Sequence, residues 1–162
     1  MSPAQPPSRP RLFVDADACP VREEAVRVAE RFGLQVFLVA NGGIRPHPHP
    51  LVRTVIVAEG PDEADRWIAE QTRPLDLCVT SDLPLAARVV EAGGAVLKPT
   101  GEALTETNVR EALAMRDLMT DLRAANPLSQ GGGGKPFSKA DRSRFLERLD
   151  WALRKLTRGE AI

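Results

Sequence analysis

The sequence predicts an α/β fold, a Rossmann-like and mainly parallel sheet with helices on both faces, followed by two C-terminal helices. The first observation is alternation, because short apolar runs and amphipathic helical stretches follow one another over the first two thirds of the chain. The second is that Pro, Gly and Asp residues stand at the ends of these runs. The third is that the connections are short. Strands joined by single helices therefore pair in parallel through right-handed crossovers.

Length and composition fit one ordinary domain. The chain has 162 residues and a mass of 17.6 kDa, of which 43% are hydrophobic and 27% charged. The 22 basic and 22 acidic residues cancel, which excludes a polycation that coats nucleic acid. The charge is uneven, however, because residues 135–162 carry eight basic and four acidic side chains. This basic tail is a weak indication of an anionic partner, and composition alone favours a solvated helix face.

Localisation is predicted from what the sequence lacks. No apolar run approaches the roughly 18 residues that would span a membrane. Residues 1–10 are rich in proline and have no apolar core, so we expect a disordered leader rather than a secretory signal. Cys19 and Cys78 lie far apart in apolar surroundings, which is typical of thiols in a reducing cytoplasm.

Each element of the first half is predicted from its own residues. Pro20 suits the start of a helix, where its missing N–H costs nothing, and Gly33 suits the end. Alternating prolines between Pro46 and Pro50 exclude a helix there. The expected elements are a strand over 11–17 that ends in carboxylates, a helix over 20–33, a strand over 34–40, a turn at 41–43, an extended loop over 44–51 and a strand over 55–58.

The second half continues the alternation and then changes to helices. The expected elements are a helix from about 60 to 72, a strand over 75–80, a helix from Pro84 to Gly93, a strand over 95–97, a helix capped by Asn108 that runs to Ala125, and a helix from Ser138 onward. A Gly-rich loop at 129–134 separates the last two. We expect both helices to pack against the sheet unit, so that residues 11–158 form one domain.

Polar side chains gather where the predicted strands end. Because ligands of open parallel sheets bind at the carboxyl ends of the strands, these residues should share one edge. They are Asp15 and Asp17 after the first strand, Asn41 after the second, Asp62 and Asp65 on the helix after the third, and Thr80, Ser81 and Asp82 after the fourth. Carboxylates packed together repel one another unless a cation joins them, and Mg²⁺ or Mn²⁺ prefers oxygen ligands. The pattern therefore favours metal-assisted hydrolysis of a phosphate ester or phosphodiester.

Simpler roles exist for several of these aspartates. Asp62 is a natural N-cap, and capping is its favoured role. Asp82 precedes Pro84 by two residues and is an N-cap candidate too, although capping explains it less well. Asp17 is a possible cap for the helix that begins at Pro20. Asp15 directly follows an apolar strand, so a structural role explains it least. Asp76 begins its strand at the opposite edge and is expected to be structural.

Other features carry weaker signals. The run that ends in Lys135 lacks the first glycine and the Ser/Thr of a phosphate loop, so we expect a hinge. His47 and His49 are expected at the surface, Cys19 as a packed thiol and Trp67 in the core. The candidate phosphate contacts are Arg45, Lys135, Lys139 and Arg142.

Four ordered segments resemble the YaiI/YqxD family of uncharacterised bacterial proteins. They are Val14–Pro20, Gly60–Asp65, Thr80–Ala86, and Lys135–Ser138 with Asp141, Arg142 and Phe145. The likeness spans about Leu12 to Leu156. It implies a fold related to PIN and NYN nuclease domains and no established activity.

The PIN likeness assigns roles to individual residues. It implies that Asp15 is the aspartate after the first strand, that Asp65 is the acidic residue on a central helix, and that Thr80 to Asp82 is the Thr/Ser-x-Asp pattern after the fourth strand. Asp17 has no clear equivalent. The helices after Thr105 exceed a minimal PIN core, so substrate and catalysis do not follow from the likeness.

Three functional hypotheses result. The leading one is a Mg²⁺- or Mn²⁺-dependent nuclease acting on RNA or single-stranded nucleic acid, with RNA favoured over DNA as the partner. Asp15, Asp65 and Asp82 would bind metal with help from Asp17, while Asn41, Thr80, Ser81, Arg45, Lys135 and Arg142 would bind substrate. The second is a phosphatase of the haloacid dehalogenase type that uses Asp15 and Asp17. The third is a non-catalytic RNA-binding module that uses the basic C-terminal helix.

Overall fold

The structure is a computed structural model that describes residues 9–125 and 136–162. Its centre is a six-stranded sheet in the order β3-β2-β1-β4-β5-β6. The first five of these strands are parallel, and β6 is antiparallel to β5. The strands are β1 (Leu12–Asp15), β2 (Val36–Ala40), β3 (Val52–Ile56), β4 (Leu77–Val79), β5 (Ala95–Leu97) and β6 (Ala103–Leu104). The predicted α/β class with a mainly parallel sheet is confirmed.

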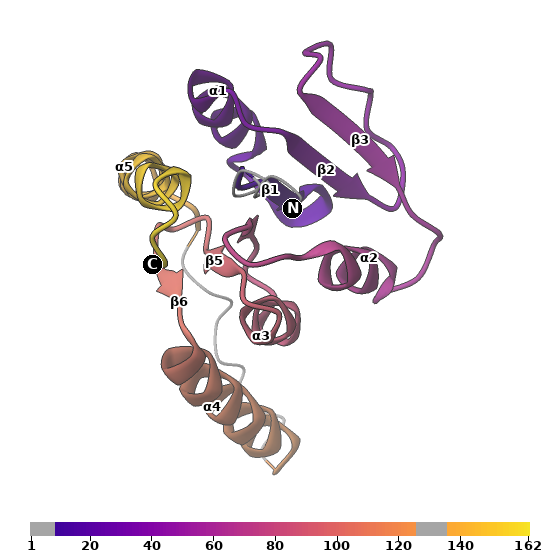
Figure 1. The fold of residues 1–162 in the computed structure, drawn as a ribbon. Coiled ribbons are helices and arrows are strands. Elements are labelled where there is room, and N and C mark those ends of the chain that lie inside the picture. The colour runs from indigo at the N-terminus through magenta and orange to yellow at the C-terminus, as the bar shows by residue number, and fades with distance from the viewer. Residues whose placement is uncertain (1–8, 126–135) are drawn as a thin grey trace, which may run out of the picture.

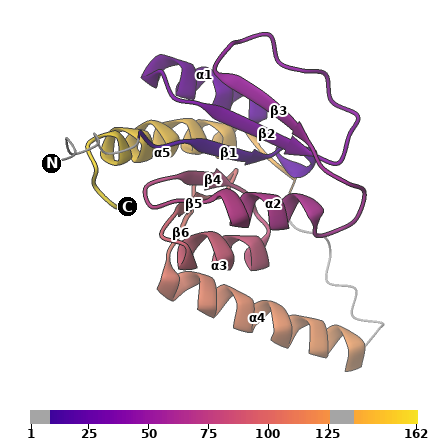
Figure 2. The ribbon, with the colours of Figure 1, turned by 45° about the vertical axis from the view of Figure 1, so that its right-hand side comes forward.

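Helices cover both faces of the sheet. They are α1 (Arg22–Phe32), α2 (Glu63–Gln71), α3 (Leu83–Glu91), α4 (Glu106–Ala125) and α5 (Lys139–Thr157), with a 3₁₀ turn η1 (Ala16–Ala18) between β1 and α1. Figure 1 shows α1 and α5 on one face and α2 and α3 on the other. The remaining helix, α4, is outermost and lies along α3 (Figure 2).

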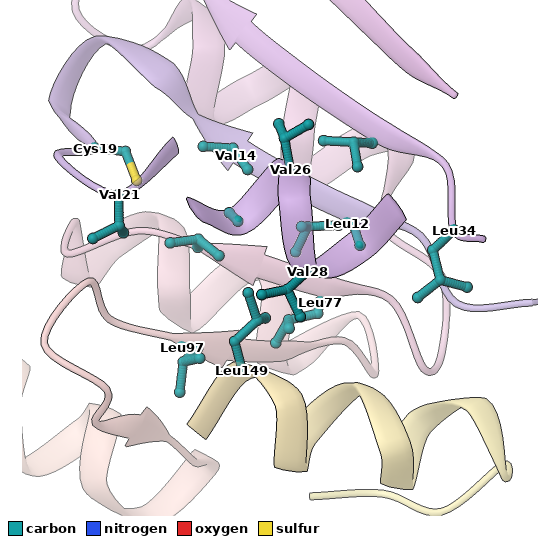
Figure 3. Packing of buried hydrophobic residues seen from close by; sticks show 14 of the residues in the cluster. Leu12, Val14, Cys19, Val21, Val26, Val28, Leu34, Leu77, Leu97 and Leu149 are labelled. Carbon is teal, nitrogen blue, oxygen red and sulfur yellow. The ribbon is translucent and has the colours of Figure 1, made fainter. Parts of the chain in front are cut away.

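Successive side chains of each strand point to opposite faces of the sheet, so the sheet contributes to one hydrophobic core on each face. Leu12 and Val14 face α1 and α5, where α5 contributes Phe145 and Leu149, and all four are fully buried (Figure 3). Each such side chain stabilises the fold by roughly 1.5–3 kcal/mol through burial. Phe13 points to the opposite face, beneath α2 and α3. The sheet is thus apolar on both faces, as parallel sheets are.

Three aromatic rings anchor α2 to the sheet. Phe13 and Phe37 stack with their centroids 4.9 Å apart. Trp67 lies tilted against both, at 6.0 Å from Phe13 and 5.8 Å from Phe37. The predicted core position of Trp67 is confirmed, and its ring is half-buried.

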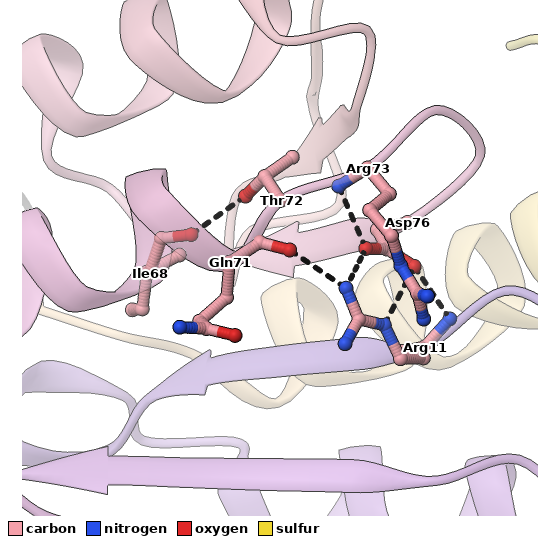
Figure 4. Close-up of polar contacts among 6 residues, drawn as sticks. All are labelled: Arg11, Ile68, Gln71, Thr72, Arg73 and Asp76. Atoms are coloured by element: carbon pink, nitrogen blue, oxygen red, sulfur yellow. Dashed lines mark hydrogen bonds and ion pairs between the residues drawn. The ribbon is translucent and has the colours of Figure 1, made fainter.

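A buried ion pair closes the amino-terminal edge of the sheet. Asp76 is 2% exposed and accepts a hydrogen bond from the Arg11 guanidinium at 2.7 Å. The same carboxylate accepts bonds from the backbone N–H groups of Arg11 and Arg73, at 3.0 and 2.9 Å (Figure 4). Gln71 accepts a further bond from Arg11 through its carbonyl. Asp76 is therefore structural, as predicted, because every charge it buries is paired and hydrogen-bonded.

Two strands differ from the prediction. The third strand spans 52–56 rather than 55–58, because its pairing with β2 runs from Val36 opposite Val52 to Ala40 opposite Ile56. A sixth strand was not predicted. It is two residues long and pairs with β5 after a tight turn in which Gly101 adopts a φ of 94°. Tertiary pairing, rather than local propensity, sets both.

The cap of α4 lies earlier than predicted. Asn108 is not the N-cap, because the helix already begins at Glu106. Instead Asn108 Oδ1 accepts from the Thr105 N–H at 2.6 Å, and Thr105 Oγ1 accepts from the Asn108 N–H at 3.3 Å. This reciprocal pair satisfies two backbone donors at the start of the helix.

Some predictions lie outside the described residues. These are the Gly-rich loop at 129–134, Lys135, and residues 1–8 of the expected leader. Of that leader, Arg9 is described and donates a hydrogen bond to the Phe32 carbonyl at the end of α1. Among the helices described here, none combines the length and the apolarity needed to cross a bilayer.

Candidate functional site

The order in which the chain adds strands to the sheet reverses between β1 and β4. From β1 the chain continues to β2 on one side, and from β4 it continues to β5 on the other, while β1 and β4 are themselves paired. Such a switch point leaves a crevice at the carboxyl ends of the two strands. Asp15 is the last residue of β1, and Thr80 directly follows β4. The topology therefore places both predicted segments at the position where open α/β sheets bind ligands.

Thr80 connects the two segments. Its hydroxyl lies 3.5 Å from Asp15 Oδ2, to which it donates, and it accepts from the Asp82 N–H at 3.0 Å. Asp82 Oδ1 in turn accepts from the Leu85 N–H at 3.0 Å, which makes Asp82 the N-cap of α3. The capping role considered for Asp82 is thus real. It uses one carboxylate oxygen, and the other makes no hydrogen bond within the described part of the chain.

The charges of Asp15 and Asp82 also act on Asp65. Burial first, then the charges of Asp82, Asp15 and Asp62, raise the pKa of Asp65 to about 6, while Arg88 acts in the opposite direction. The carboxylate on the first turn of α2 is therefore affected by the charges of the segments that follow β1 and β4.

Asp15 is affected in the same way. Burial first, then the charges of Asp17 and Asp82, raise its pKa, while the hydrogen bond from Thr80 lowers it. The hydrogen bonds of Thr80 thus join the segments of Asp15 and Asp82, and the charges of both carboxylates act on Asp65.

The donor set fits a hard divalent ion by its chemistry. It consists of carboxylate and hydroxyl oxygens, which Mg²⁺ and Mn²⁺ prefer. Over residues 9–125 and 136–162, however, no three His, Cys, Asp or Glu side chains are already arranged to hold a metal ion. The carboxylates are thus close enough to repel one another without forming a finished three-ligand geometry.

Asp17 and Asn41 join neighbouring loops. Asp17 Oδ2 accepts from the Asn41 N–H at 2.9 Å, and the Asn41 amide donates to the carbonyls of Ala58 and Gly60 at 2.9 and 3.2 Å. The suggestion that Asp17 caps the next helix is wrong, because the N-cap of α1 is Val21. Asn41 thus ties together the segments that follow β2 and β3, and its contact with substrate stays a prediction.

The carboxyl-end edge of the sheet that carries Asp15, Asp17, Asp65 and Asp82 is here called the acidic edge. Two exposed residues, Asp62 and Ser81, lie beside these carboxylates in the sequence. Asp62 occupies the N-cap position of α2, but its side chain makes no capping hydrogen bond, so the predicted capping role is wrong. Its charge raises the pKa of Asp65 instead. Ser81 is exposed between Thr80 and Asp82.

The described candidates for phosphate contacts are Arg45, Lys139 and Arg142. Arg142 pairs with Glu24 at 3.3 Å, and its guanidinium lies 5.8 Å from the centroid of the Phe137 ring. Arg45 is exposed in the loop after β2, and Lys139 is exposed at the first residue of α5. In the described ranges, no ion pair links any of these cations to the carboxylates after β1 and β4.

Arg88 was not predicted. The buried positions of α3 are Leu85, Ala86 and Val89, so helical spacing alone places Arg88 at the border of the apolar face. The sequence alone does not show that α3 packs against α2. Through this packing the Arg88 charge acts on Asp65.

The cysteine and histidines near the site have local roles. Cys19 is buried, which confirms the predicted packed thiol. Burial also raises the pKa of this thiol to about 11. His47 and His49 accept backbone N–H bonds through Nδ1, from His49 and Leu51 respectively, and so stabilise their proline-rich loop.

Comparison with known proteins places the chain in a family. The profile described as "Uncharacterized BCR, YaiI/YqxD family" matches residues 13–155. The chain belongs to the YaiI/YqxD family. A UPF0178 protein of Cereibacter sphaeroides is 63% identical over 144 residues, which cover 89% of this chain and 88% of that protein. A UPF0178 protein of Rhodopseudomonas palustris is 49% identical over 151 residues, covering 93% and 94%.

The resemblance to this family over Leu12–Leu156 is thereby confirmed. Comparison with solved structures gave no significant match. The family is uncharacterised, so its name assigns no reaction to the acidic edge.

Proposed function

We propose that the protein is a Mg²⁺- or Mn²⁺-dependent nuclease that hydrolyses phosphodiester bonds in RNA or other single-stranded nucleic acid. One observation carries the proposal. Asp15 and Asp82 follow the paired strands β1 and β4 at the switch point of the sheet, and their charges, together with burial, raise the pKa of Asp65 on α2. Folding tolerates such repulsion where a bound cation relieves it.

Each of these side chains has its own role in the proposed reaction. Asp15, Asp65 and Asp82 would hold the ion, and Thr80 keeps the Asp15 carboxylate oriented through its hydroxyl. A bound divalent ion would orient a water and neutralise charge on a phosphoryl oxygen. The exposed Ser81 would contact the substrate beside the ion.

The test is cleavage of labelled single-stranded RNA by the full chain with Mn²⁺. Asp15→Asn removes a charge while keeping the shape, and we expect it to slow cleavage by about 100-fold or more, since removing a metal ligand costs several kcal/mol. The matched control is Asp121→Asn, an exposed aspartate on α4, which should cleave as the wild type does. Cleavage that persists unchanged in Asp15→Asn, or in excess chelator, would rule the proposal out.

The phosphatase alternative gains no support from the geometry. It requires Asp17 to act as an acid beside Asp15, whereas Asp17 accepts a hydrogen bond from the backbone of Asn41. The chain also enters η1 directly after Asp15 and α1 at Arg22, which leaves little room for the flap that such enzymes place there.

A further inference from the structure

One flank of α5 carries a row of basic side chains with a tryptophan at its centre. Its members recur at i, i+4, i+7, i+11 and i+14, so they share one side of the helix. At 1.5 Å per residue the row is about 21 Å long. Its members, here called the α5 stripe, are Arg144, Arg148, Trp151, Lys155 and Arg158.

The α5 stripe starts near the acidic edge of the sheet. Arg144 Nη1 lies 3.5 Å from the Thr100 carbonyl, in the turn that follows β5. That turn is at the carboxyl end of β5, next to the end of β4 where Asp82 follows. The other flank of α5 packs along α1, as the ion pair between Arg142 and Glu24 shows. The stripe thus runs from the proposed site along the open side of the helix.

The centre of the α5 stripe holds two cations without neutralising them. The Arg148 guanidinium carbon lies 4.6 Å from the centroid of the Trp151 ring, and the Lys155 ammonium lies 5.1 Å from it. Trp151 is 37% exposed. Within the described chain, neither cation forms an ion pair with a carboxylate, whereas Arg154 on another face pairs with Asp150 at 2.7 Å. Cation–π contact orders both heads and leaves their charge available to an anion.

We propose that the α5 stripe binds the backbone of single-stranded RNA and guides it toward the acidic edge; the choice of RNA rests on the proposed nuclease function. Ordered cations match phosphate groups, and an exposed indole offers a stacking surface for an unpaired base, which an acidic peptide would not use. A membrane surface fits less well, because the apolar face of α5 is already buried against the sheet.

The test measures binding separately from cleavage. The full chain is titrated into a labelled oligouridylate in EDTA, and fluorescence anisotropy gives the affinity at several salt concentrations. We expect Arg148→Glu to weaken binding by roughly tenfold or more. The slope of log affinity against log salt concentration should become shallower by about 0.7 for each phosphate that the variant no longer neutralises. The matched control is Arg154→Glu, which changes the net charge equally on the same helix and should weaken binding by less than about twofold.

The tryptophan provides a second readout. Trp67 and Trp151 are the two tryptophans of the chain. In a Trp67→Phe background, fluorescence therefore reports on Trp151 alone, and we expect RNA to quench it. Trp151→Phe should retain most of the affinity because it keeps an aromatic face, while Trp151→Ala should lose affinity by several fold.

The outcomes separate this inference from the proposed reaction. Equal weakening by the two arginine variants, no weakening by either, or capture of anionic vesicles in place of RNA would overturn the inference. RNA that binds through the α5 stripe but is not cleaved with Mn²⁺ leaves the inference standing and removes the nuclease. Cleavage that depends on Asp15, with unchanged affinity in Arg148→Glu, overturns the inference and leaves the proposed nuclease standing.

Discussion

The carboxyl group of Asp65 sits in surroundings that oppose its charge. Burial and the neighbouring carboxylates of Asp82 and Asp15 raise its pKa to about 6, and the Arg88 charge offsets this only in part. The native state therefore binds a proton on Asp65 more tightly than the unfolded chain does, whose value is near 3.8. A residue kept in such a place destabilises the fold whenever it is ionised.

The difference in stability between the wild type and the Asp65→Asn variant should therefore depend on pH in a definite direction. Between the unfolded and folded pKa values, the stability contributed by this group falls as pH rises, and the full penalty applies above the folded value. We therefore expect Asp65→Asn to raise the melting temperature at about pH 8, where Asp65 is charged, and to change it little at about pH 4. Circular dichroism melts without divalent ions measure both. An equal shift at the two pH values would show that packing, not charge, is responsible.

The two long helices differ in what they bury, although α4 has 20 residues and α5 has 19. The buried residues of α5 form a continuous face, namely Phe145, Leu149, Ala152, Leu153 and Leu156. In α4 the buried residue is Val109, in the first turn. The apolar side chains further along α4 are about half exposed, namely Met115, Leu118, Met119 and Leu122. Tertiary packing therefore stabilises α5 along its whole length and α4 mainly where it meets α3.

A matched pair of substitutions tests this difference between helices. Leu149→Ala empties a fully buried site on α5 and should cost about 2–5 kcal/mol of unfolding free energy. Leu118→Ala makes the same change on α4 at a side chain that is 52% exposed, and should cost less than about 0.5 kcal/mol. Urea denaturation at equilibrium measures both. A large cost at Leu118 would mean that a surface in solution covers this part of α4.

At the scale of the whole molecule, the acidic edge joins parts that fold from distant regions of the chain. β1, the start of α2 and the start of α3 each supply one carboxylate. An ion shared by Asp15, Asp65 and Asp82 would hold these three segments together only in the folded state. It would therefore stabilise the whole fold by mass action.

Thermal melts with added Mn²⁺ test this coupling without any substrate. At an ion concentration about 100 times the dissociation constant, the native state gains about 2.7 kcal/mol. For a chain of this size, we expect a rise of roughly 5–10 °C in melting temperature at neutral pH. Asp15→Asn combined with Asp82→Asn should abolish the rise, and Asp121→Asn should preserve it. A rise that survives the double substitution would place the ion elsewhere.

Much of the fold was predictable because its signals are local. Apolar runs, helical spacing and Pro or Gly at the ends predict each element within a few residues, except for β6 and the bounds of β3. Those two depend on pairing with β5 and β2, which no short window of sequence contains. The candidate site was predicted as a set of strand-end aspartates. The individual roles of Asp17 and Asp62 were not, because each depends on a neighbour from another loop or on helix geometry.

By itself, the sequence determined the α/β class, the order of the elements and the aspartates available to a site, since periodicity and turn residues act over a few positions. Only the tertiary structure decided that Asp15 and Asp82 meet through Thr80, and that Arg88 lies near Asp65. It also decided which flank of α5 remains open. Each of these depends on which faces pack together, and packing brings into contact residues that are far apart in the chain.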